Sequence, residues 1–177
     1  DREFMLEAVR QNGRALGWAA ESFRADREVV LEAVRQNGLA IYYADESLQA
    51  DREVVLEAVR QCGFALGSAA DSFWADREMV LAAVRQDGLA LEYADKSLQA
   101  NREVVLEAFR QNGKALRFAD EKLLADREFV LEAVKQNAEV FEYAAKELQK
   151  DKELKKIVAG YAKAQKLARE WTKKHPK

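Results

Sequence analysis

The 177-residue sequence contains one cysteine, one proline and one histidine, and these low counts already exclude several classes of protein. A single Cys62 cannot form an intramolecular disulfide, so the chain is not a disulfide-stabilised domain. No apolar run approaches the roughly 18 to 20 residues that cross a bilayer, so we expect no membrane span. With 49% hydrophobic residues at a net charge of −2, the sequence is not that of a disordered chain.

Side chains that perform catalysis or hold cofactors are also scarce. The only histidine, His175, stands beside Pro176 near the end of the sequence, and Cys62 has no histidine near it. A metal site needs clustered His, Cys or carboxylate ligands, and the glycines stand singly rather than in a phosphate-binding loop. We therefore expect no enzyme, and no catalytic residue, metal or cofactor.

What the sequence does contain is a 25-residue repeat. Asp, or once Asn, recurs every 25 residues from Asp1 to Asp151, and six successive units share one pattern of apolar and polar positions. Units 1 and 3 agree at 18 of 25 positions, whereas units 1 and 2 agree at 16. A fixed period of this kind is typical of a solenoid, and the better match between alternate units indicates duplication of a 50-residue block.

Each unit is predicted to form a pair of helices followed by one further turn. In the second unit, Asp26 is a suitable N-cap for a first helix of about eleven residues, and Gly38 is expected to end it as a left-handed C-cap. A shorter helix over 39–44 follows, then a turn over 46–49 capped by Asp45. Because one such unit cannot bury its own apolar face, the predicted fold is an all-α solenoid of stacked units.

The two ends of the array differ. Residues 1–150 hold six units, whereas residues 151–177 carry Lys156 where all six units have Leu and continue as one amphipathic helix. We expect this helix to cap the stack, because a terminal repeat needs one solvent-exposed face. At the other end Phe4 and Met5 are more apolar than a cap requires, which predicts an end-to-end contact or missing sequence there.

Charge is distributed unevenly along the chain. Residues 150–177 hold ten Lys or Arg against three Asp or Glu, while residues 1–149 hold 19 against 28. A basic helix suits nucleic acid, another polyanion or an anionic membrane, with Lys163, Lys166 and Trp171 as contact candidates. We favour a solvated outer face of the capping helix instead, because its cations are mainly Lys rather than Arg, and nucleic acid is the less favoured partner.

Arginines also recur at the second and tenth positions of the units. Such a track suits a polyanion, but Glu32 precedes Arg35 by three residues, as Glu7 precedes Arg10. This spacing favours ion pairs on the helix surface, worth only tenths of a kcal/mol each. Because the body of the chain is acidic, we interpret the arginines as structural.

Differences between the units gather in the second helix and the turn after it. Positions 14, 17 and 24 of the unit change chemistry from one unit to the next, which predicts a continuous surface suited to a protein partner. The contact candidates on this surface are Tyr42, Phe64, Trp74, Arg117 and Leu124. For Phe64 and Trp74 the alternative is packing between units.

The repeat resembles a known family. Its Asp-Arg-Glu start, Val-Val-Leu-x-Ala-Val and Gln-Asn-Gly segments, and the Leu-Ala-Leu-x-Tyr-Ala segment at 89–94, are similar to the tandem repeats of domain of unknown function 4116. The resemblance covers about residues 1–150, although unit 6 departs at Ala138, Val140 and Phe141. It implies an all-helical module without established catalytic residues, so no functional residue is carried over.

Together these observations predict a non-catalytic scaffold or protein-interaction module that belongs to a larger assembly or a longer protein. The alternative is a module that binds a polyanion, nucleic acid or an anionic membrane through its basic C-terminal helix.

Overall fold

The structure, a computed structural model, describes residues 1–174, and over this range it consists of α-helices and 3-10 helices joined by short turns. His175 and Pro176, the histidine and the expected helix stop, lie outside the described residues. The predicted all-α fold is confirmed. None of the described helices is both long enough and apolar enough to cross a membrane.

Each 25-residue unit contains three helical segments. The first is a ten-residue α-helix, and these are α1 (Arg2–Gln11), α3 (Arg27–Gln36), α5 (Arg52–Gln61), α6 (Arg77–Gln86), α8 (Arg102–Gln111) and α10 (Arg127–Gln136). The second is a 3-10 helix of six residues, and these are η1 (Gly13–Trp18), η2 (Gly38–Tyr43), η3 (Gly63–Ser68), η5 (Gly88–Tyr93), η6 (Gly113–Phe118) and η7 (Ala138–Tyr143). The third is about one turn long, and these are α2 (Glu21–Arg24), α4 (Glu46–Gln49), η4 (Asp71–Phe73), α7 (Lys96–Gln99), α9 (Glu121–Leu124) and α11 (Lys146–Lys150).

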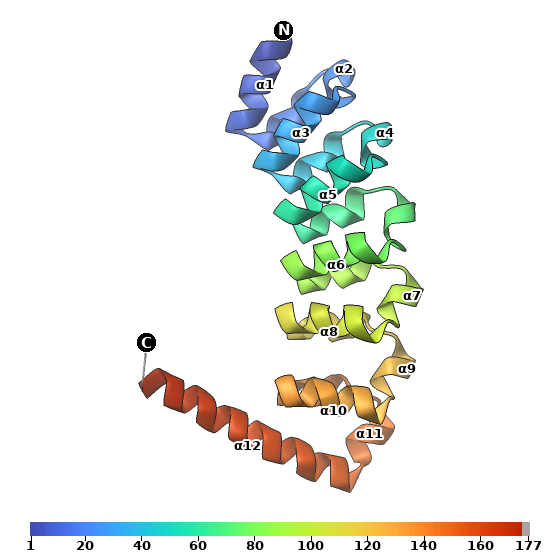
Figure 1. Cartoon of the computed structure of the whole chain (residues 1–177), viewed down its shortest axis with the longest axis vertical. Helices are drawn as coiled ribbons and strands as arrows, with labels where there is room; N and C mark the ends of the chain where they lie inside the picture. The colour runs from blue at the N-terminus through green and yellow to red at the C-terminus, as the bar shows by residue number, and fades with distance from the viewer. Residues whose placement is uncertain (175–177) are drawn as a thin grey trace.

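The units stack in sequence order, so that the first helices form one column and the short third segments run along one edge (Figure 1). Consecutive units are joined by the same backbone hydrogen bond at all five junctions. The N–H at position 20 of one unit donates to the carbonyl at position 24 of the unit before it, as Asp45 does to Arg24 at 2.9 Å. The final helix, α12 (Lys152–Lys174), crosses below α10 at an angle, and its far end lies apart from the stack.

The helix boundaries follow from side-chain caps. The Asp26 carboxylate accepts the N–H groups of Glu28 and Val29 at 3.0 and 3.2 Å, which starts α3 as predicted. The prediction that Gly38 ends this helix in a left-handed conformation is wrong, because no residue in 1–174 has a positive φ. Instead Asn37 is extended, and its side chain accepts the N–H of Leu39 and so starts η2.

Glycine at position 13 is needed for close approach between units rather than for a turn. A Cβ atom on Gly38 would lie far inside van der Waals contact with the carbonyl oxygen of Ala58 in the next unit. Gly13, Gly63 and Gly88 face the corresponding carbonyls of Ala33, Ala83 and Ala108 in the same way. Each first helix therefore sits on the start of the preceding 3-10 helix, and a side chain there would separate the two layers.

A second contact explains why alternate units resemble each other. The ring of Tyr43 in unit 2 lies against Gly17 in unit 1, where a Cβ atom would be 3.0 Å from the ring. Tyr93 lies against Gly67 in the same way between units 4 and 3. At the junction between units 2 and 3 the large and small residues are exchanged. Unit 2 has Tyr42 at position 17, and unit 3 has Ser68 at position 18. At the last two junctions neither residue is small, because Glu92 is followed by Phe118 and Arg117 by Tyr143, so this alternation is confined to units 1 to 4.

The junction between units 5 and 6 departs from this pattern. Gly113 does not meet a carbonyl of unit 6, since the nearest atom to its Cβ position is in the ring of Phe109, 3.5 Å away. Phe109 stands where the other units have Val. The Arg102 guanidinium binds Glu132 at 2.8 Å, whereas the equivalent arginines of units 1 to 3 bind carboxylates at positions 1 and 3 of the next unit. The larger Phe109 side chain therefore accompanies a wider separation of the layers here.

Helix α12 covers the C-terminal end of the stack with its first half. Leu154 and Val158 are buried against unit 6. The Gln165 side chain accepts the N–H of Ala138 at 2.9 Å and donates to the carbonyl of Val134 at 3.1 Å. Beyond Gln165 every residue to Lys174 is exposed, so the cap ends about halfway along the helix.

Candidate interaction surface

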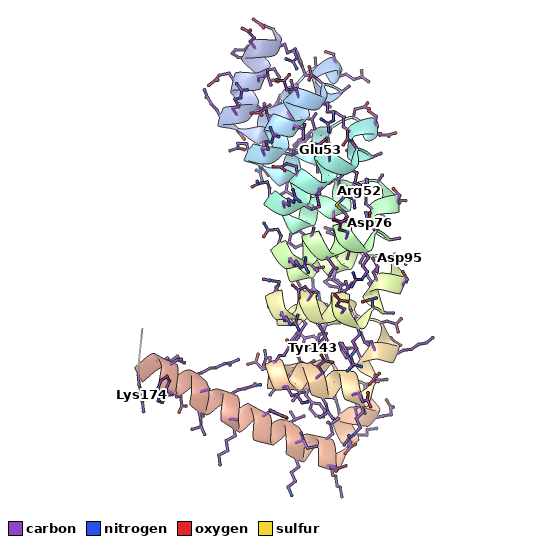
Figure 2. All side chains as sticks on the ribbon, in the orientation of Figure 1. Arg52, Glu53, Asp76, Asp95, Tyr143 and Lys174 are labelled. Atoms are coloured by element: carbon purple, nitrogen blue, oxygen red, sulfur yellow. The ribbon has the colours of Figure 1, made fainter. Side chains whose placement is uncertain are left out.

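The arginines of the first helices are engaged in ion pairs that bridge consecutive units. The Arg27 side chain binds both Asp51, at 2.9 Å, and Glu53 of the next unit, and Arg52 bridges Asp76 and Glu78 in the same way (Figure 2). The hydrogen bond from Arg27 holds the pKa of the Asp51 carboxyl below its usual value, against the opposing effect of burial.

A second set of ion pairs follows the tenth position of the units. Arg35 binds Glu32 of its own helix at 3.0 Å, and Arg10 of the preceding unit binds the same carboxylate at 3.0 Å. The hydrogen bond from Arg10 holds the pKa of Glu32 below its usual value. The predicted pair between Glu32 and Arg35 is present, but Arg10 pairs with Glu32 of the next unit rather than with Glu7, and most pairs run between units. They do not present a line of unpaired cations to a polyanion.

The variable positions 14 and 17 lie on the outward side of the 3-10 helices, which we call the 3-10 face. Its residues, in chain order, are Arg14, Gly17, Leu39, Tyr42, Phe64, Gly67, Leu89, Glu92, Lys114, Arg117, Glu139 and Glu142. Units 2 and 3 place apolar and aromatic side chains on this face, whereas units 5 and 6 place charged ones there. The 3-10 face therefore has two chemically distinct halves.

The first half contains a hollow of about 510 Å³, which we call the aromatic hollow. It is lined by Arg14, Leu39, Tyr42, Tyr43, Phe64, Gly67, Ser68 and Tyr93. Tyr42 packs edge-on against Tyr43 at 5.2 Å between ring centroids, and Phe64 packs edge-on against Tyr93 at 6.2 Å. Tyr42 is 68% exposed and Leu39 38% exposed, so two large apolar side chains stand together beside this hollow.

Two of the predicted contact residues, Tyr42 and Phe64, thus come together in one hollow. Two further aromatic residues of the hollow, Tyr43 and Tyr93, were not among the sequence-based candidates. The signal for them was present in the sequence, because glycine at position 17 of units 1 and 3 leaves room for a large ring in the following unit.

Position 24 has a structural role instead. The Trp74 indole N–H donates to the carbonyl of Leu66 at 3.0 Å, and the ring is half-buried against the core. Gln49 and Gln99 donate from the same position to carbonyls of their own 3-10 helices, including those of Ile41 and Leu91. These side chains satisfy the free carbonyl groups at the end of each 3-10 helix, so of the alternatives for Trp74 the structure supports packing.

Of the remaining candidates on the repeats, Arg117 lies in the second half of the 3-10 face and Leu124 lies at position 24, in α9. Arg117 is exposed and its guanidinium lies 4.5 Å above the ring of Phe118, while Leu124 is half-buried. Both line a hollow of about 760 Å³ together with Glu92, Lys96 and other polar residues. The mixture of charges there makes this hollow different in kind from the aromatic hollow.

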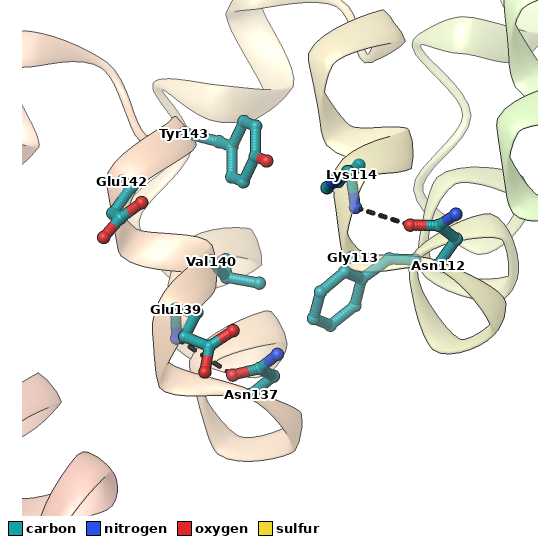
Figure 3. A pocket seen from close by; sticks show the side chains of 9 residues that line it. Asn112, Gly113, Lys114, Asn137, Glu139, Val140, Glu142 and Tyr143 are labelled. Atoms are coloured by element: carbon teal, nitrogen blue, oxygen red, sulfur yellow. Dashed lines mark hydrogen bonds between the residues drawn. The ribbon is translucent and has the colours of Figure 1, made fainter.

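The open junction between units 5 and 6 contains a further hollow of about 440 Å³. Figure 3 shows Lys114 and Glu139 on opposite sides of it, with Val140 and Tyr143 along the floor and wall. The hydrogen bonds drawn there are local, from Lys114 N to Asn112 and from Glu139 N to Asn137, and they start the two 3-10 helices. The Asn112 and Asn137 side chains therefore serve local structure, whereas the Glu139 carboxylate accepts from Arg169 of α12.

The candidates on α12 lie apart from the 3-10 face of units 1 to 4. Lys163 and Lys166 are exposed, and Trp171 is exposed over 61% of its surface. Arg169 in the same segment reaches Glu139 at 3.5 Å. The structure therefore offers two separate surfaces, one aromatic on the repeats and one basic on α12.

The described residues include potential metal ligands and one thiol. Within residues 1–174, no three His, Cys, Asp or Glu side chains come together in a way that would hold a metal ion. Cys62 is half-buried at the end of α5, where other units have Asn or Asp.

These features define a helical tandem-repeat protein, an α-solenoid with units joined by shared hydrogen bonds and ion pairs. The chain belongs to the family described as domain of unknown function 4116, whose model matches residues 1–49, 51–99 and 101–149. Each match spans two of the 25-residue units, in agreement with the alternation of Gly17 and Tyr43. Comparison with curated proteins and with solved structures finds no match.

Proposed function

We propose that the chain is a non-catalytic protein-interaction module whose partner binds the aromatic hollow of the 3-10 face. One observation carries this proposal: Leu39 and Tyr42 are exposed beside the half-buried rings of Phe64 and Tyr93. Large rigid aromatic side chains next to a concavity are the usual anchors of protein interfaces. The ion-paired arginines of the first helices offer no comparable surface.

The aromatic hollow is tested by selecting peptides that bind the whole chain from a displayed library, and by measuring their affinity for variants. Tyr42→Ser and Leu39→Ser remove exposed side chains, so the fold is expected to tolerate them. We expect each to weaken the selected peptides by about tenfold or more, because hot-spot truncations cost about 2 kcal/mol.

The chain provides a matched control. Glu92 occupies the same position of the repeat as Tyr42, two units further along, and is exposed. Glu92→Ser should leave the affinity unchanged. Unaltered binding by the Tyr42→Ser and Leu39→Ser variants would show that the hollow is not the contact surface.

The alternative function, polyanion binding through α12, predicts a different result. Lys163→Ser and Lys166→Ser would then weaken binding, and affinity would fall steeply as salt rises. A partner bound through the aromatic hollow should be nearly indifferent to both changes.

A further inference from the structure

A hollow lies between the first helices α5 and α6, at the junction of units 3 and 4. It has a volume of about 350 Å³ and is lined by Leu56, Arg60, Glu78, Ala82, Arg85 and Gln86. We call it the Ala82 hollow, because Ala82 stands at position 7, where the five other units have Glu. None of these residues lines the aromatic hollow, so the two are separate features of the surface.

Elsewhere the glutamate at position 7 joins the arginines at position 10 of two consecutive units. The Glu32 carboxylate accepts from Arg10 of the preceding unit and from Arg35 of its own helix, at 3.0 Å in each case. Glu107 binds Arg85 and the arginine of its own helix in the same way, at 3.2 and 2.9 Å. The repeat therefore places one carboxylate between two guanidinium groups, which form charge-assisted hydrogen bonds with it.

Ala82 leaves the two arginines of the hollow without this shared carboxylate. Arg60 is exposed, and within residues 1–174 no carboxylate lies at ion-pair distance from its guanidinium. The arginines at position 10 of units 1, 2, 4 and 5 each bind at least one carboxylate. The acidic residue of the hollow, Glu78, does not replace the missing group, because it is bound to Arg52 at 2.6 Å.

The same substitution also uncovers an apolar side chain. Leu56, at position 6, is half-buried. Its counterparts are buried at every junction where the next unit has Glu at position 7, and these are Leu6, Leu31, Leu81 and Leu106. The aliphatic stem of a glutamate can cover the leucine beside it, whereas the methyl group of alanine is too short. The Ala82 hollow therefore combines cationic groups with a partly uncovered apolar surface.

We propose that the Ala82 hollow is a docking site for a glutamate side chain of a protein partner. The stem of this glutamate would cover Leu56. Its carboxylate would accept from Arg60 and Arg85, as Glu32 does from the equivalent arginines. A phosphate group would satisfy the arginines, but it has no aliphatic stem to lie over the leucine. The charge and the apolar surface together therefore favour glutamate.

The geometry of the site is tested by Ala82→Glu in the full chain. This variant restores the residue found in the other units, so we expect it to fold. The introduced carboxyl should accept from both arginines of the hollow. Its pKa, followed by NMR, should therefore lie below the ordinary range, as the hydrogen bond from Arg10 lowers the pKa of Glu32. An ordinary pKa for the introduced carboxyl would overturn the proposal, because the hollow would then not hold a carboxylate.

Binding is tested with displayed peptides that are selected on the parent chain and depleted of those that also bind Ala82→Glu. We expect the remaining peptides to share a glutamate, and we expect its replacement by glutamine to weaken binding by about tenfold. Gln111→Glu is the matched control, because it adds the same charge at an exposed position outside the hollow. It should leave the affinity unchanged. An empty selection, or peptides that bind without a carboxylate, would overturn the proposal.

A double-mutant cycle identifies a direct contact. Arg60→Gln in the chain and Glu→Gln in the peptide should each weaken binding by about tenfold, and the two together little more than either alone. Losses that multiply would overturn the proposal. Displacement of the peptides by millimolar inorganic phosphate at constant ionic strength would also overturn it, because the arginines would then accept any anion.

The variants of the aromatic hollow separate this proposal from the proposed function. Tyr42→Ser should leave these peptides unaffected, since the two hollows share no residue. Arg60→Gln should likewise leave peptides of the aromatic hollow unaffected. Each proposal therefore fails or succeeds by its own measurements.

Discussion

The regular junctions between units 1 to 5 and the open junction between units 5 and 6 are built from almost the same sequence. In the regular ones, a glycine such as Gly88 lies directly under an alanine carbonyl of the next unit, here that of Ala108. In the open one, a Cβ atom on Gly113 would meet only side chains, the ring of Phe109 at 3.5 Å and the amide of Asn137 at 3.9 Å. One larger core residue thus accompanies a change from close backbone contact to a hollow. The comparison associates tight stacking with small volume at positions 9 and 13, although unit 6 also differs at Ala138, Val140 and Phe141.

Replacing each of these glycines by alanine should give the largest difference in stability between the two kinds of junction. Gly88→Ala would force a methyl group into the Ala108 carbonyl, and we expect a loss of at least about 2 kcal/mol. Gly113→Ala meets no backbone atom, and neither glycine has a positive φ, so we expect a gain of about 0.4 to 1 kcal/mol from reduced freedom of the unfolded chain.

Urea denaturation followed by circular dichroism measures both variants against the parent. Because a repeat array does not always unfold in one step, the midpoint and the slope should both be compared. Equal losses from Gly88→Ala and Gly113→Ala would mean that the two junctions are equally tight in solution.

The role of Phe109 can be isolated with a double-mutant cycle. Phe109→Val restores the residue found at this position in the regular units, and we expect unit 6 to move closer to unit 5. Gly113→Ala, harmless in the parent, should then become destabilising. The expected coupling energy is on the order of 1 to 2 kcal/mol, because the two residues share one contact. Additive effects in the cycle would show that another feature keeps this junction open.

Much of this architecture could be predicted from the sequence, because caps and apolar spacing are local. The N-cap role of Asp26, the short turn over 46–49 and the period of 25 residues depend on neighbours within one unit. The role of Gly38 could not be predicted in this way. Both a C-cap and a close contact favour glycine, and only the position of the next unit distinguishes them.

The residues of the candidate surface also differ in whether their roles could be predicted from the sequence. Tyr42 and Phe64 could be recognised because they vary against a constant background. Trp74 varies too, but its indole N–H replaces the amide of Gln49 in binding carbonyl groups, so the change from Gln to Trp preserves a structural role that Leu124 at the same position cannot fill. Chemical variety at a repeat position therefore indicates a binding surface only where the side chain has no internal acceptor or donor to serve.

The smallest expected effect concerns the ion pairs that bridge the regular junctions. Arg27→Gln removes the partner of Asp51 and Glu53, and we expect a loss of stability smaller than any of those above at neutral pH and low salt, since the pairs are largely exposed. The pKa of Asp51 is lowered in the folded chain, so its contribution is present above the unfolded pKa near 4. It disappears as the pH falls through the lower folded value. Parent and Arg27→Gln should therefore differ in unfolding midpoint at pH 7 and converge in acid.

A carboxyl titration of Asp51 by NMR should show its pKa rising toward the ordinary value in Arg27→Gln. An unchanged titration would assign the lowered pKa to the N-cap hydrogen bonds from Glu53 and Val54, and the junction would then owe little to its arginine.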